Sequence, residues 1–405
     1  MMLRAANGQK APGSALAMVL VVLAVLSLIA PDRALSSSDE AAYKYNNEGL
    51  ELSKSGDYEG AIEAFKQARR YLPANDNVRK NLIIAYNNYG GYFINEGEFY
   101  RAIEQFEKAY YYDEAYPYTL YNLGQAYYLV QNMRKAEEYL ERVYEIDPSI
   151  KGLKGLLEKV KKESGVEGGF STNETLHFIM ALSPGISIDA SSYLRVNLED
   201  AYGRVGMLLN HYPDKKTIVV LYSEKDYDSL LGGRAWWVLA LYDGKMRIPT
   251  GKLKYTRDEV VRIIYHEYAH AVAHDIAGSG VPVWLQEGIA TKAETFVTPK
   301  DKGELKRYLN SYGFIPLSRM PASFANIKDH NVVTLLYLES YLLVEYIILR
   351  GGYRGLHDIL LELGKGEHID MAIASVLGED MPAFEKGWER YLRSEFGLNE
   401  LKYIQ

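Results

Sequence analysis

Two histidines four residues apart, His266 and His270, constrain this chain more than any other feature. Four residues on an α-helix make one full turn and about 40° more, so both imidazoles reach the same side. Neutral imidazole is a preferred ligand of zinc, and a catalytic zinc site takes three protein ligands and keeps its fourth position for water. The pair therefore predicts a helix with a metal centre whose third ligand lies elsewhere.

A carboxylate that can complete such a centre follows a glycine-rich turn. Glu287 lies in an apolar segment that should form a second helix, and Gly278 and Gly280 supply the turn before it. The sequence therefore predicts His266, His270 and Glu287 as the ligands of one Zn²⁺ ion.

Glu267 follows His266 directly, so its side chain points to a neighbouring part of the helix surface. It is predicted to interact with a metal-bound water molecule and not to bind the metal itself. Its carboxylate would accept a proton from that water and pass it to the leaving amine. Thr256 and the acidic residues after it form a capping-box pattern, which predicts that the helix begins there. His274 lies about 6 Å further along the helix axis than His270 and is predicted to stay outside the centre. The histidines without metal-ligand spacing are predicted to be structural, and they are His177, His211, His330, His357 and His368.

A helical pattern repeats three times in the first part of the chain. Each copy places a small residue, a large apolar residue and a second small or β-branched residue at the same spacing. The copies are Ala61, Phe65 and Ala68; Ala102, Phe106 and Ala109; and Ala136, Leu140 and Val143. The third copy follows the second by 34 residues and the second follows the first by 41, which predicts an insertion near residues 86–92.

This pattern resembles the tetratricopeptide repeat (TPR) family, in which stacked helix pairs bury a continuous core. A final helix at 150–162 would close the array. Residues 41–147 hold 18 of the 35 tyrosines. Some of these rings are expected to pack between helices, and the others to line a groove that binds an extended peptide or a partner helix.

The amino-terminal segment is predicted to be a targeting signal and not part of the fold. Arg4 and Lys10 precede an apolar run over residues 15–30, which is short for a membrane span and suits a signal peptide. Residues 1–38 are therefore predicted to be a signal peptide or, alternatively, an uncleaved membrane anchor. Either alternative places the rest of the chain outside the cytoplasm, in the periplasm or beyond the cell. The net charge of −7, without a long basic run, argues against a nucleic-acid partner, and the absence of cysteine excludes disulfides and thiol catalysis.

The carboxy-terminal half mixes strand and helix patterns. Strands are expected at 170–180, 217–222, 236–242 and 245–249, the last two as a hairpin around Asp243 and Gly244. Helices are expected at 189–209 and, beyond the metal pair, at 302–311, 332–349, 357–363 and 381–396. The fold class is therefore an α + β multidomain protein, with an all-α repeat array over 41–163, a hinge at 165–169 and an α+β domain over 170–400.

The histidine pair and the segment around Glu287 resemble the gluzincin metallopeptidases, and in particular their peptidase-MA-like, thermolysin-like members. The resemblance implies that an edge strand at 245–248 holds the substrate, although an ordinary solvent-facing hairpin is the alternative. It also implies that Tyr337, or else Tyr341, stabilises the developing oxyanion. Such enzymes often place an aspartate four residues after the ligand glutamate, where this chain has Thr291. The partner of a zinc histidine is therefore left open between Asp275, Glu294 and a backbone carbonyl.

The resulting hypothesis is an exported zinc metallopeptidase whose repeats recruit a protein substrate or partner. An alternative is an inactive TPR scaffold of the cell envelope that carries a peptidase-like domain. Hydrolysis of a non-peptide amide, such as one in the cell wall, would use the same water chemistry and is a third candidate.

Overall fold

The computed structural model describes residues 36–231, 244–250, 257–324, 327 and 329–398. Its contacts divide the chain into two compact units, with the boundary between Thr172 and Asn173. Almost all of the predicted targeting signal lies outside the described residues.

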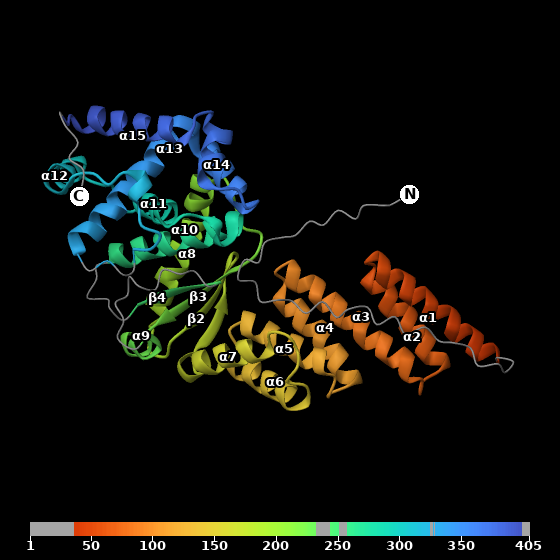
Figure 1. Ribbon diagram of the computed structural model, residues 1–405. Coiled ribbons are helices and arrows are strands. Elements are labelled where there is room, and N and C mark those ends of the chain that lie inside the picture. The colour runs from red at the N-terminus through yellow and green to blue at the C-terminus, as the bar shows by residue number, and fades with distance from the viewer. Residues whose placement is uncertain (1–35, 232–243, 251–256, 325–326, 328, 399–405) are drawn as a thin grey trace, which may run out of the picture. The chain divides into compact units, whose positions relative to one another are not determined.

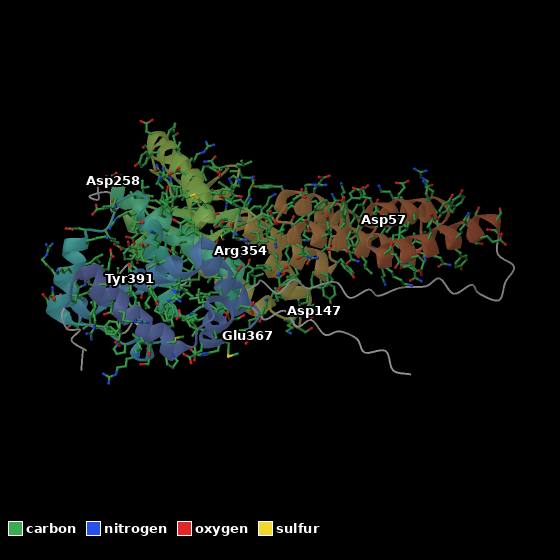
Figure 2. The ribbon with its side chains drawn as sticks, turned by 90° about the horizontal axis from the view of Figure 1, so that it is seen from above. Asp57, Asp147, Asp258, Arg354, Glu367 and Tyr391 are labelled. Atoms are coloured by element: carbon green, nitrogen blue, oxygen red, sulfur yellow. The ribbon has the colours of Figure 1, made fainter. Side chains whose placement is uncertain are left out.

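The amino-terminal unit consists of helices that pack in successive pairs, each pair against the next (Figure 1). Asp57, labelled in Figure 2, accepts a hydrogen bond from the backbone nitrogen of Gly60 and so caps the second helix. The helices are α1 (Ser37–Ser55), α2 (Tyr58–Tyr71), α3 (Asp76–Asn95), α4 (Phe99–Tyr112), α5 (Pro117–Leu129), α6 (Met133–Ile146) and α7 (Leu153–Glu167). The predicted all-α array is confirmed.

Close contact between the two helices of each pair explains the repeat pattern. A glycine on the first helix faces the large apolar residue of the second, and an added Cβ would come within 2.7, 2.3 and 2.6 Å of that side chain in the three pairs. The facing residues are Gly49 with Phe65, Gly90 with Phe106, and Gly124 with Leu140. These glycines share the 41- and 34-residue spacings of the predicted copies.

The predicted insertion near residues 86–92 is a lengthening of one helix. α3 has 20 residues and α5 has 13, so their difference of seven equals the difference between the two repeat spacings. α7 is also longer than expected, because Val160, Glu163 and Glu167 bury one side of it at helical spacing. The predicted hinge at 165–169 is therefore wrong in its first half, which is helical.

The carboxy-terminal unit contains a four-stranded sheet in the order β1-β2-β3-β4 among the described strands. β2 pairs with β3, and β3 pairs with β4, in parallel. The strands are β1 (Ser171–Glu174), β2 (Phe178–Leu182), β3 (Thr217–Tyr222) and β4 (Lys245–Pro249). β2 and β3 are buried along their whole length, as expected for parallel strands covered on both faces.

The strands differ from the predicted ones in two places. The single strand predicted at 170–180 is wrong, because the chain turns between β1 and β2, where the backbone nitrogen of Phe178 donates to Oγ1 of Thr175. The first strand of the predicted hairpin, at 236–242, lies outside the described residues. Its second strand is β4, which is last in the order of described strands.

Helices make up the rest of this unit; α10, α11 and α13 pack against one another, and α10 also contacts β4 of the sheet (Figure 1). The predicted helices at 332–349 and 357–363 belong to α13, which is kinked at Gly352. The nine-residue α14 is not predicted, because a helix this short gives little periodicity to recognise. The helices are α8 (Ile188–Leu209), α9 (Glu224–Leu231), α10 (Arg257–Ala277), α11 (Val283–Glu294), α12 (Lys302–Tyr312), α13 (His330–Gly364), α14 (Ile369–Leu377) and α15 (Met381–Phe396).

Among the described residues, one helix, α13, is long and apolar enough to cross a membrane by length and composition. Half of its most apolar stretch is buried inside the protein. Leu335, Leu343 and Ile347 of α13 belong to the core that also contains α10 and α11. Its apolar character therefore also suits a core helix.

Gly288 permits the close approach of α11 to α13. A Cβ at this position would lie 2.2 Å from the carbonyl oxygen of Ser340. We expect Gly288→Ala to lower the free energy of unfolding by about 1–3 kcal/mol, because two backbones would have to separate. Gly203→Ala, at an exposed position of α8 with no heavy atom within 4 Å of the added Cβ, is the control and should raise stability by about 0.5–1 kcal/mol. Denaturant titration measures both, and equal stability of the two variants would contradict the packing argument.

Candidate metal centre and active site

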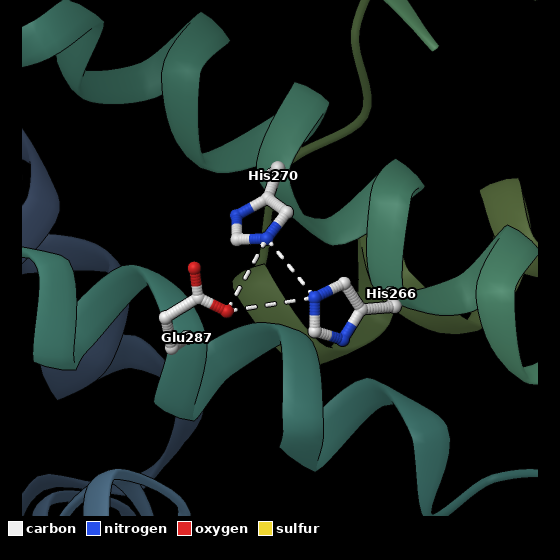
Figure 3. A group of neighbouring side chains, drawn as sticks. All are labelled: His266, His270 and Glu287. Carbon is white, nitrogen blue, oxygen red and sulfur yellow. Dashed lines mark hydrogen bonds and ion pairs between the residues drawn. The ribbon is translucent and has the colours of Figure 1, made fainter. Parts of the chain in front are cut away.

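Two neighbouring helices carry the predicted ligands. α10 carries His266 and His270 one turn apart, and α11 carries Glu287. The turn between the helices is a short 3-10 helix, Gly278–Gly280, as the glycines predicted. Figure 3 shows the three side chains pointing toward one another from the two helices.

The three facing atoms are spaced as a tetrahedral metal requires. Nε2 of His266 and Nε2 of His270 lie 3.2 Å apart. Oε2 of Glu287 lies 3.5 Å from Nε2 of His266 and 3.7 Å from Nε2 of His270. Tetrahedral ligands about 2.0–2.1 Å from zinc are about 3.4 Å from each other. The two nitrogens and the oxygen therefore fit a single zinc-sized ion.

The electrostatics of the cluster also favour a cation at its centre. Oε2 of Glu287 is buried without a hydrogen-bond partner among the described residues. Burial raises the pKa of Glu287, but His270 and His266 outweigh it and the pKa is lowered. Burial lowers the pKa of His270 to about 4, so this ring is neutral and its nitrogen lone pair is available. Burial alone would lower the pKa of His266, but Glu287 and Glu294 raise it well above the ordinary value. His266 therefore attracts positive charge, either a proton or a metal ion.

Glu294 orients His266. Its Oε1 lies 2.9 Å from Nδ1 of His266, which leaves Nε2 of that ring facing the other ligands. Its other oxygen, Oε2, lies 3.3 Å from Nζ of Lys300 and 3.6 Å from Nη1 of Arg262. Burial raises the pKa of Glu294, but His266 and the two cations outweigh it and hold the pKa at about 2. Of the alternatives left open by the sequence, Glu294 takes this place, whereas Asp275 pairs with His211.

Glu267 and Tyr337 line the same cavity as His266. Burial, with a contribution from Glu287, raises the pKa of Glu267 to about 7 although His266 opposes it. Burial and the carboxylates of Glu287 and Glu267 raise the pKa of Tyr337, so its hydroxyl keeps its proton. Tyr341 is not among the residues that line this cavity, and burial, with smaller contributions from Glu345 and Tyr391, raises its pKa.

The cavity beside the cluster has a volume of about 590 Å³. His330, which is predicted to be structural, lines this cavity but is not among the clustered ligand atoms, and His274 also lies outside that group. Arg262 and Lys300 are site residues that sequence reasoning missed. The lining residues are Arg262, Ile263, His266, Glu267, Thr291, Glu294, Lys300, Ile327, His330, Val333, Thr334, Tyr337 and Leu338. Helical spacing could have suggested Arg262, which precedes His266 by four residues.

The fold and the site together define a peptidase-like domain that follows a helical-repeat array. Residues 245–394, which include the cluster, match the family model of the Peptidase MA superfamily. Residues 45–70 and 117–150 match models of the tetratricopeptide repeat. The chain therefore carries a Peptidase MA superfamily domain preceded by TPR repeats. This confirms the resemblance to TPR proteins and, as far as the superfamily, the resemblance to peptidases. Comparison with curated proteins finds no match to this chain.

Proposed function

We propose that this protein is a zinc-dependent metallopeptidase of gluzincin type that hydrolyses peptide bonds with an activated water molecule. The observation that carries the proposal is the convergence of Nε2 of His266, Nε2 of His270 and Oε2 of Glu287 beside the carboxylate of Glu267. The Peptidase MA superfamily match over the same residues supports it.

Each residue has a defined part in this mechanism. His266, His270 and Glu287 would hold the zinc ion, which supplies a Lewis acid and lowers the pKa of water when bound. Glu267, with a pKa of about 7 before the metal binds, accepts a proton from the attacking water and returns it to the leaving nitrogen. Tyr337, which keeps its proton, donates a hydrogen bond to the carbonyl oxygen as negative charge develops there.

Metal removal tests the proposal directly. The purified protein without residues 1–35 should contain about one zinc ion per chain, and a chelator should abolish hydrolysis of unstructured peptides. Added Zn²⁺ should restore the activity, because the ligands belong to a folded frame of two helices. Elemental analysis and a fluorescent peptide assay measure the two quantities. Hydrolysis that persists in the metal-free protein would exclude the mechanism.

An inactive scaffold remains the competing function. It requires the repeat array and a folded peptidase-like domain, but it does not require a base or a hydroxyl donor at the cluster. Glu267 and Tyr337 both line the cavity that His266 enters, and this favours the enzyme.

We also propose that the protein acts outside the cytoplasm and that the repeats recruit its protein substrate or a partner. A groove of about 420 Å³ between α2, α3 and α4, lined by three aromatic residues of α3 and by mostly charged residues of α2 and α4, supports the second part. Deletion of residues 41–162 should leave hydrolysis of a short peptide unchanged and slow cleavage of the natural protein target. Equal cleavage of that target by both forms would contradict recruitment, and recovery of the full chain in the cytoplasm would contradict export.

A further inference from the structure

We propose that the active-site cavity selects substrates that carry a carboxylate within about two residues of the cleaved bond, next to an apolar side chain. The inference rests on the proposed function and names the substrate class for the same site. The carboxylate has two possible sources, the free carboxyl terminus of a peptide or an acidic side chain, and the experiment below separates them.

The walls of the cavity suit an apolar side chain. Ile263 of α10 and Val333 and Leu338 of α13 line it, together with Ile327. Its volume of about 590 Å³ is within the range of pockets that bury a small-molecule ligand. The cavity therefore has room for one apolar side chain and for the group that follows it.

The cations in the cavity exceed the acidic groups that they contact. Arg262 and Lys300 both face Oε2 of Glu294, while Oε1 of that carboxylate lies against His266. The single negative charge of Glu294 thus faces two permanent positive charges. Among the described residues, Arg262 and Lys300 form ion pairs with Glu294 and with no other acidic group. A guanidinium has five N–H donors and an ammonium three, so most of their donors remain for a ligand. The Lys300 side chain is 24% exposed, so its charge is only partly screened by water.

A buried hydroxyl points to the same ligand. Thr291 is 3% exposed and lines the cavity, yet its Oγ1 has no hydrogen-bond partner among the described residues. Buried polar groups are normally paired, because leaving one unpaired is costly. Thr291 lies between Glu287 and Glu294 on one face of α11, so its hydroxyl can donate a hydrogen bond to an incoming carboxylate oxygen.

The distance between the cations and the metal cluster sets the position of the carboxylate. Arg262 precedes His266 by one helical turn, which is about 6 Å along the axis of α10. An extended peptide spans about 3.3–3.6 Å per residue. The carboxylate therefore belongs about two residues beyond the bond that is cut.

The test uses three quenched fluorescent peptides of one sequence with leucine next to the cleaved bond. The first ends in a free carboxylate two residues after that bond, the second ends in an amide, and the third is an amide with glutamate at that position. We expect kcat/KM for at least one acidic peptide to exceed that of the neutral amide by about 10- to 100-fold, mainly through KM. The better acidic peptide identifies the source. Equal kcat/KM for all three would overturn the inference while leaving the peptidase proposal intact.

Lys300→Gln should bring the ratio of acidic to neutral peptide toward one, because Arg262 and His266 still hold Glu294. Lys302→Gln is the matched control, since Lys302 is highly exposed, pairs with Glu395 and does not line the cavity. The ratio is measured within each variant, so a general loss of activity does not affect it. An unchanged ratio in Lys300→Gln would contradict the role of this cation.

A protein that lacks peptidase activity can be distinguished from one whose cavity does not recognise carboxylates. If no peptide is cut, calorimetric binding of the same three peptides to zinc-loaded Glu267→Gln protein measures recognition alone. Tighter binding of an acidic peptide would support the pocket without any peptidase activity, and equal binding of all three would overturn the pocket as well.

Discussion

Glu267→Gln should hydrolyse peptides about 10²- to 10⁴-fold more slowly than the parent protein while it keeps its zinc. The amide is close in shape to the carboxylate but cannot accept the proton of the attacking water. The loss should appear in kcat, because Glu267 is not among the three converging ligand atoms. A peptide assay and elemental analysis of the same preparation measure both quantities.

The control for this variant is Asp258→Asn, which removes an exposed carboxylate from the first turn of the same helix. Its activity should match that of the parent. Parental kcat in Glu267→Gln would show that another group accepts the proton, and loss of zinc from this variant would make Glu267 part of the metal centre.

Glu287→Ala should weaken zinc binding by more than about 100-fold, beyond the 10- to 100-fold loss typical when a residue that only orients a ligand is removed. Two histidines would remain, and the site would lose the carboxylate among its three converging ligands. Hydrolysis should fall with the metal content and should recover only at much higher zinc concentration. Competition with a zinc-binding dye measures the affinity.

Gln286→Ala is the matched control for Glu287→Ala. The Gln286 side chain donates to the carbonyl oxygen of Val281 and is not one of the cluster ligands. It should keep the parental zinc affinity. Equal zinc content in both variants would move the third ligand away from Glu287 and would remove the basis of the proposed mechanism.

The part of the site that follows from local helix geometry could be predicted from the sequence. His266 and His270 are one turn apart on any helix, so their shared direction needs no tertiary information. The choice of Glu294 over Asp275 could not be made in this way, because it depends on how α11 lies against α10. Lys300 could not be predicted for the same reason, since it reaches the site through the carboxylate of Glu294, whereas the helical spacing of Arg262 and His266 could have suggested Arg262.

In the fold, too, features that follow from local periodicity could be predicted, and features that depend on tertiary contacts could not. The repeat spacing predicted the helical array, because each pair obeys the same packing rule, in which Gly90 faces Phe106 as Gly124 faces Leu140. The turn that separates β1 from β2 depends on one side-chain contact of Thr175, which no periodicity records. Tyr337 and its alternative Tyr341 were predicted through the family resemblance, and the finding that Tyr337 lines the cavity required the position of α13.

The seven additional residues of α3 suggest how a helical repeat array tolerates a change in length. Seven residues fall about 20° short of two complete turns, so the side chains after an insertion face almost the same direction as before. Gly90 can therefore still meet Phe106 although the helix is longer. A change of three or five residues in that helix would rotate this contact face by about 60° or 140°. We therefore expect insertions and deletions in such arrays to favour lengths close to whole turns.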